Sequence, residues 1–133
     1  MGTLPKLIAI ALPTFLVIDL IWLGVVARPF YQAQLGPLMR ADVNWIAALL
    51  FYGIYVVGIV ILAVLPAVEQ ESFSQAVVLG ATLGLVAYAA YDLTNLATLN
   101  GFPATMAVVD LIWGTILTGG VSAITYKLWF LLQ

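Results

Sequence analysis

The chain has 133 residues, of which 65% are hydrophobic and only 8% are charged, and its net charge is −2. A soluble domain carries roughly 25% charged residues, so this chain could not cover its own surface in water, and the bilayer is its natural solvent. The absence of Cys excludes disulfides, and the absence of His removes the commonest metal ligand and the usual general base. The four basic residues are scattered, so the composition does not favour nucleic acid as a partner.

Four apolar segments reach the length of about 20 residues that a helix needs to cross a bilayer. They cover residues 7–27, 45–65, 75–99 and 104–126. We therefore expect an all-α polytopic membrane protein, a four-helix transmembrane bundle whose termini lie on the same side. The whole chain, residues 1–133, would form one transmembrane domain in contact with lipid.

Prolines and turn residues predict where these helices bend and end. Pro13 should kink the first helix, and the loop 28–44 that follows could include a short interfacial turn. Pro66 should end the second helix, and the string NGFP at 100–103 predicts a tight turn before the fourth.

The orientation in the membrane is nearly undetermined by the basic residues. Lys6 and Lys127 lie on the side of the termini, and Arg28 and Arg40 lie on the opposite side, so the positive-inside count is a tie. We place the termini in the cytoplasm, with dual topology as the alternative. Aromatic belts are expected at both interfaces, from Phe30, Tyr31 and Trp45 on one side and from Tyr126, Trp129 and Phe130 on the other.

One short string recurs in the apolar segments, and each copy contains an acid. The strings VIDLIWLG, YDLTNLA and VVDLIWG contain Asp19, Asp92 and Asp110. Because successive helices run in opposite directions, all three acids should lie roughly 9–12 Å below the same membrane surface. Tyr52 and Tyr55 of the second segment fall at about the same depth. The sequence therefore predicts a layer of three carboxyls and two phenols.

Two stripes with a spacing of four residues lead to these acids. One consists of Ala76, Gly80, Gly84, Tyr88 and Asp92, and the other of Asp110, Gly114, Thr118, Ser122 and Tyr126. Stripes of small residues are typical of closely packed membrane helices, so both stripes should face protein rather than lipid. Asn95 lies one turn beyond Asp92 and could orient that acid or bind a ligand.

The DLIW strings, with YDLTNLATL between them and FYQAQLGPLMR after the first segment, resemble the DUF2177 family of predicted bacterial membrane proteins. The resemblance covers nearly the whole chain. It implies a multi-pass, four-helix protein of the cell inner membrane. It implies no catalytic residues, because the family name denotes an unknown function.

The acids are candidates for a functional site because an ionised Asp in mid-membrane costs about 2.5–3.5 kcal/mol on insertion scales. Three neighbouring carboxylates would also repel one another, so we expect at least one to be protonated at neutral pH. The candidate proton- or substrate-binding residues are Asp19, Asp92, Asp110, Asn95, Tyr52, Tyr55, Tyr88, Trp22 and Trp113. In the alternative, the same residues are structural: the acids fix helix register by hydrogen bonds, and the aromatic residues fill space between helices.

Three functions are compatible with this cluster. The first is a small proton-linked transporter or carrier of a small cationic or hydrophobic ligand, and it implies a homo-oligomer because four helices are too few for a pathway. The second is an accessory or scaffold subunit of a membrane complex. The third, a lipid-active enzyme, has weaker support because the chain has no nucleophile motif and no phosphate-binding loop. Of these three functions, the two non-enzymatic ones are favoured, and we expect neither a metal nor a cofactor.

Overall fold

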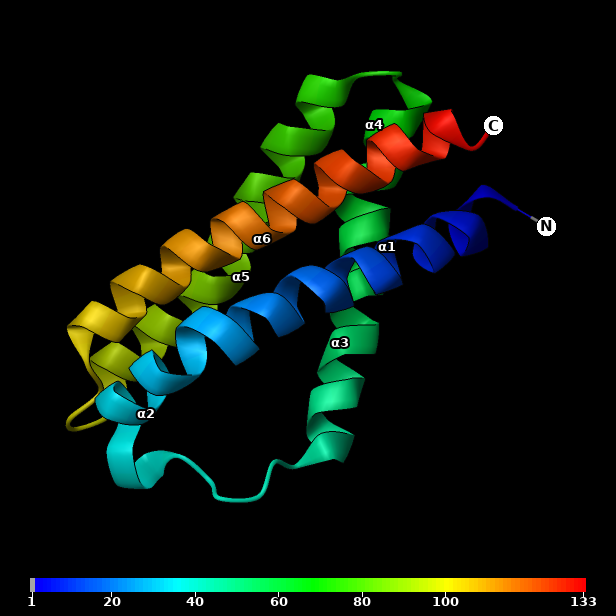
Figure 1. Cartoon of the computed structure of the whole chain (residues 1–133). Helices are drawn as coiled ribbons and strands as arrows, with labels where there is room; N and C mark the ends of the chain where they lie inside the picture. Colours follow the sequence, from blue (N-terminus) through cyan, green and yellow to red (C-terminus); the bar gives the residue numbers. More distant parts are fainter. Residues whose placement is uncertain (1) are drawn as a thin grey trace.

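The computed structural model describes residues 2–133, so Met1, the first residue of the predicted domain, lies outside the described residues. Four helical passages are long and apolar enough to cross a membrane: Thr3–Leu38, Trp45–Glu69, Phe73–Thr98 and Ala104–Leu131. Residues 2–133 contain no strand. The prediction of an all-helical chain with four candidate spans is therefore confirmed (Figure 1).

The first passage is longer than predicted. It consists of α1 (Thr3–Ile21), the π-helical segment η1 (Trp22–Ala27), α2 (Arg28–Leu35) and the 3-10 turn η2 (Gly36–Leu38). The predicted end at Ala27 is wrong, because Pro29 occupies the first turn of α2, where a helix does not need the missing N–H. Eight residues that were expected in a loop therefore form a helix.

The second passage also continues past its predicted end. It consists of α3 (Trp45–Ile59), the π-helical segment η3 (Val60–Val64) and α4 (Leu65–Glu69). The Asn44 side chain caps α3 by accepting a 3.2 Å hydrogen bond from the backbone N–H of Ala47. Pro66 does not end the passage, because it lies in the first turn of α4, directly after η3 has interrupted the regular hydrogen-bond ladder.

The last two passages are single helices, α5 (Phe73–Thr98) and α6 (Ala104–Leu131). Ser72 caps α5 by accepting a 3.2 Å hydrogen bond from the N–H of Gln75. The turn between the helices contains Gly101 at φ 79°, a conformation that favours glycine. α6 extends beyond the predicted end at Tyr126, since polarity marks the edge of a membrane and does not by itself stop a helix.

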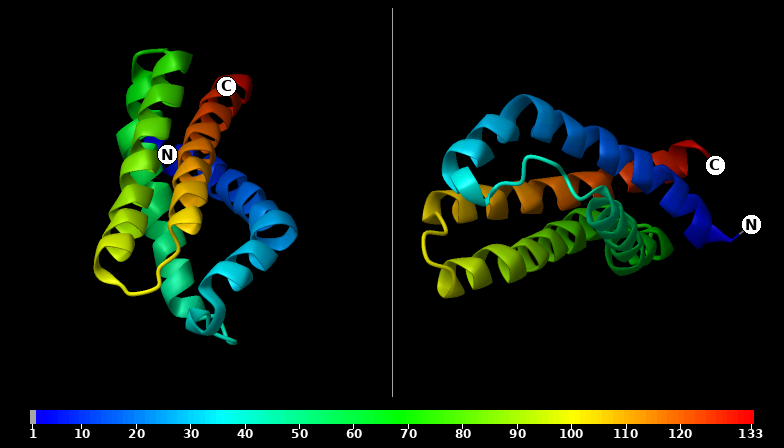
Figure 2. Two further views of the ribbon diagram at one scale, coloured as in Figure 1. Left: turned by 90° about the vertical axis from the view of Figure 1, so that its left-hand side faces the viewer. Right: turned by 90° about the horizontal axis from the view of Figure 1, so that it is seen from below.

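The helices form an antiparallel hairpin with the other two passages packed on it. α5 and α6 share the most extensive contact, α1 packs on α6, and η3 packs on α5. In Figure 1, α3 stands at a steep angle to α1 and α6. Figure 2 places both termini at the same end of the molecule. The side of the membrane on which they lie stays a prediction.

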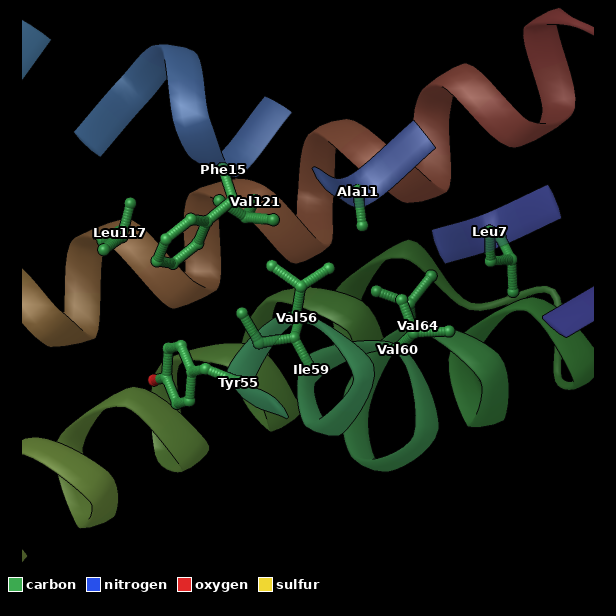
Figure 3. Packing of buried hydrophobic residues seen from close by; sticks show 10 residues of the cluster. All are labelled: Leu7, Ala11, Phe15, Tyr55, Val56, Ile59, Val60, Val64, Leu117 and Val121. Carbon is green, nitrogen blue, oxygen red and sulfur yellow. The ribbon is translucent and has the colours of Figure 1, made fainter. Parts of the chain in front are cut away.

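The main hydrophobic core lies where α1, α3, η3 and α6 meet (Figure 3). The buried residues of α1 are Leu7, Ala11, Phe15 and Asp19, at a spacing of four. The first three pack in the core with residues such as Val60 and Val121. Asp19 continues the same stripe, so the face that packs α1 into the bundle also carries its acid to the inside.

The two predicted stripes meet each other along the hairpin as a ladder of residue pairs. A Cβ atom added to Gly80 would overlap Ser122, one added to Gly84 would overlap Thr118, and one added to Gly114 would overlap the Tyr88 ring. At one end of the ladder, Ala76 packs in a cluster with Tyr126. One further step of four residues at the other end brings Asp92 opposite Asp110. The prediction that these stripes face protein is confirmed.

Candidate functional site

Three acids from three helices lie buried in the same region. The exposed fractions of Asp19, Asp92 and Asp110 are 8%, 0% and 8%. Asp110 is the common neighbour, because the register of α5 and α6 places Asp92 opposite it and Asp19 lines the same cleft as Asp110. The structure therefore brings together the three acids that the repeated string singled out.

A chain of two hydrogen bonds ends on Asp110. The Tyr31 hydroxyl donates to Oδ1 of Asp110 at 2.8 Å, and the indole N–H of Trp22 donates to the Tyr31 hydroxyl at 3.3 Å. Tyr31 was expected in an interfacial belt; it bonds an acid of the site as well, and its place in a belt stays a prediction. The N–H of Trp22, which could have bonded an acid directly, reaches one through Tyr31 instead.

Tyr31 reaches the acids because α2 folds back onto the start of α6. Phe30, Tyr31 and Leu35 pack against a cluster formed by Phe102, Met106 and Ala107. The spacing of four residues between Tyr31 and Leu35 was a signal for this contact. It was missed because Pro29 and the basic Arg28 led us to expect a loop.

The two DLIW copies meet in a reciprocal arrangement. The Trp22 and Trp113 rings stack with their centroids 4.2 Å apart and an interplanar angle of 6°. The N–H of Trp113 lies near the Asp19 carboxyl without forming a good hydrogen bond, and the N–H of Trp22 connects to Asp110 through Tyr31. Each tryptophan thus faces the acid of the other copy, as expected for similar strings on two antiparallel helices.

Two adjoining clefts open next to the acids. One, of about 220 Å³, is lined by Asp19, Trp22, Leu23, Tyr31, Ala48, Phe51, Tyr52, Tyr88, Asp110 and Trp113. The other, of about 270 Å³, is lined by Phe51, Ala87, Tyr88, Tyr91 and Asp110. Phe51, Tyr88 and Asp110 belong to both. Neither lining includes a basic side chain, and Arg28 and Arg40 are exposed elsewhere.

Some predicted residues lie outside the clefts. Tyr55 belongs to the hydrophobic core, where its hydroxyl shares a 2.7 Å hydrogen bond with Oγ1 of Thr118. Asn95 is half-buried and lines neither cleft. Asp92 is fully buried and also lines neither. Tyr52 lies beside the Asp19 carboxyl, as the depth argument predicted.

Sequence reasoning missed Phe51 as a lining residue. An apolar ring carries no chemical signal within a hydrophobic helix, and only the position next to Tyr52 hinted at its place. Phe51 stacks on Tyr55 with 5.2 Å between ring centroids and so continues the aromatic wall from the core to the clefts.

The clefts combine carboxyls with aromatic faces, a combination that suits an organic cation. Within residues 2–133, no three acidic side chains converge in a way that could hold a metal ion. The lining contains hydroxyls of tyrosine but no serine, threonine or lysine.

Comparison with known proteins identifies the family. A family model described as a predicted membrane protein, DUF2177, matches residues 4–127. The chain belongs to the DUF2177 family. The matched residues include all three acids and both tryptophans of the site, and the resemblance of the repeated strings is thereby confirmed. No curated protein and no solved structure matches the chain.

Proposed function

We propose that this DUF2177 protein is a small proton-linked carrier, and that its clefts bind a small organic cation in exchange for a proton. The observation that carries the proposal is the lining: two buried carboxyls, Asp19 and Asp110, border a cleft walled by aromatic rings, and no basic side chain neutralises them. A carboxylate in that setting requires either a proton or a bound cation.

Electrostatics support the exchange. An ionised Asp deep in the bilayer costs about 2.5–3.5 kcal/mol. Protonation of an acid in the empty site removes this cost and therefore lowers the free energy of the protein. A bound cation would compensate the same negative charge, so a proton and a cation compete to neutralise the same group of acids. Contacts with the faces of Trp22, Trp113 and Tyr88 would each add about 0.5–2 kcal/mol of cation–π attraction.

Size narrows the class of ligand. The clefts, of about 220 and 270 Å³, are below or at the lower end of the roughly 300–1,000 Å³ that drug-sized ligands occupy. Quaternary ammonium ions with short alkyl arms match this size. They also carry no ionisable proton, so any proton change on binding would come from the protein.

A carrier of this size would need a partner, and we propose a homodimer in the cell inner membrane with cytoplasmic termini. Four helices enclose only a narrow space. The α3 helix offers an exposed apolar face that a second copy could cover, formed by Trp45, Ile46, Leu49, Leu50 and Ile54.

Binding of tetraethylammonium tests the proposal. The protein in lipid nanodiscs, with Trp45→Phe and Trp129→Phe to leave only the cleft tryptophans, is titrated and followed by fluorescence. We expect Asp19→Asn and Asp110→Asn each to weaken binding about tenfold or more, because a hydrogen bond or contact to a charged group contributes about 1.5–3 kcal/mol.

Glu69→Gln is the matched control, since it makes the same change at an exposed acid of α4. It should leave the affinity unchanged. Equal affinity in the parent, Asp19→Asn and Asp110→Asn proteins would refute the cation site. In liposomes, an imposed pH gradient should drive uptake of labelled tetraethylammonium, and binding without such uptake would refute the carrier.

A further inference from the structure

Asp92 differs from the other two acids in its surroundings. Its exposed fraction is 0%, and it lines neither cleft. Asp110 lines both clefts and accepts a hydrogen bond from Tyr31. The two acids are neighbours, but only Asp110 can touch a ligand.

The ladder of α5 and α6 fixes this neighbourhood. Gly84 faces Thr118 and Tyr88 faces Gly114, each pair without room for a further methyl group. The same register brings Asp92 opposite Asp110 one turn later. The hairpin therefore holds the two carboxyls together and cannot slide to separate them.

Neither carboxyl oxygen of Asp92 has a hydrogen-bond donor among the described residues. The register of the ladder places the carboxyl of Asp110 beside that of Asp92, and two adjacent carboxyls can bond to each other only when one of them carries a proton. Two adjacent carboxylates without water repel strongly, so such pairs share one proton.

The other titratable groups around the pair come from three elements. Tyr31 of α2 bonds to Asp110, and Asp19 of α1 and Tyr88 and Tyr91 of α5 line the clefts with Asp110. None of these is basic. Tyr31 donates to Asp110 and stabilises charge there, whereas no donor stabilises charge on Asp92.

We propose that Asp92 and Asp110 share a single proton, that Asp92 holds it while the cleft is empty, and that a cation binding at Asp110 releases it. This inference rests on the proposed function. In the exchange, the O–H bond of Asp92 breaks and the proton leaves to water. The pair changes from one negative charge to two, and the bound cation returns the net charge of the site to minus one.

Calorimetry with tetraethylammonium tests the inference. Binding is measured at one pH in two buffers with different enthalpies of ionisation, and the difference gives the number of protons released. We expect about one proton per cation for the unaltered protein and for the control Glu69→Gln. For Asp92→Asn we expect binding within about threefold of the parent and no proton release.

The outcomes separate the two proposals. Binding to the unaltered protein without proton release would overturn the shared proton and leave the cation site standing. Release that persists in Asp92→Asn would show that another group holds the proton. The absence of any binding to the unaltered protein would refute the proposed function itself.

A second measurement covers the case in which Asp92→Asn does not fold. Infrared difference spectra of the unaltered protein should lose a protonated carboxyl band when tetraethylammonium is added, and in Asp92→Glu the lost band should shift in frequency. An unshifted band, or no loss of a band, would overturn the inference.

Discussion

Single residues give the candidate site its chemical character. The acids were predictable from the sequence, because an Asp within an apolar segment has no other explanation than a buried partner or a function. Tyr31 was not predictable, since its role depends on a helix that begins at a proline and on the contact of Leu35 with α6. Sequence patterns reveal an unusual residue more readily than they reveal its partner.

The hydroxyl of Tyr31 gives the first test at this scale. Tyr31→Phe removes the donor to Asp110 and the acceptor for the N–H of Trp22. We expect the free energy of unfolding to fall by about 1–2 kcal/mol, measured by titration with a denaturing detergent.

Tyr91→Phe is the matched control for that change. Tyr91 is 53% exposed, and removal of an exposed hydroxyl usually changes stability by less than about 0.5 kcal/mol. Equal effects of the two substitutions would contradict the role assigned to the Tyr31 bond.

At the scale of helices, hydropathy located the spans but not their ends. Three of the four predicted segments lie within observed passages, and the third, 75–99, runs one residue past the end of α5 at Thr98, because apolar length is what lipid selects. The ends differ since hydrogen bonding rather than polarity terminates a helix. Pro66 illustrates this, because the π-helical segment before it allows the passage to continue to Glu69.

The stripes of α5 and α6 were predicted to face protein, the structure shows that they face each other, and their glycines provide a sharp test. Gly84→Ala would place a methyl group against Thr118 and the backbone of Gly114. Overpacking costs about 1–3 kcal/mol, so we expect a clear loss of stability in the same detergent titration.

Gly58→Ala is the control, because nothing beyond the adjoining backbone of its own helix lies within 4 Å of the position that its Cβ would take. Alanine also favours helix by up to about 1 kcal/mol relative to glycine. Stability should therefore be unchanged or higher. A destabilisation as large as that of Gly84→Ala would mean that the ladder does not pack as closely as described.

At the scale of the whole molecule, all four passages expose apolar side chains, and the face of α3 is the one that we propose as the surface between two copies. Ile46 and Ile54 of α3 are 77% and 71% exposed. If this face joins two copies, cysteines introduced at Ile46 or Ile54 should form crosslinked dimers in membranes, because the chain has no other Cys. A cysteine at Val86, which is 60% exposed on α5, is the control. Equal crosslinking at all three positions would indicate random collision rather than an interface.

The interlocked glycines of α5 and α6 also limit how the clefts can open. A hairpin with no spare room between its helices moves as one block, so access must come from the passages around it. α1 and α3 make smaller contacts, and each of their passages contains a π-helical segment where backbone hydrogen bonds are irregular. Spin labels should therefore report fixed distances within the hairpin and variable distances from the hairpin to α1. Asp92 and Asp110 both belong to the hairpin, so the acid pair would stay in place while the surrounding passages move.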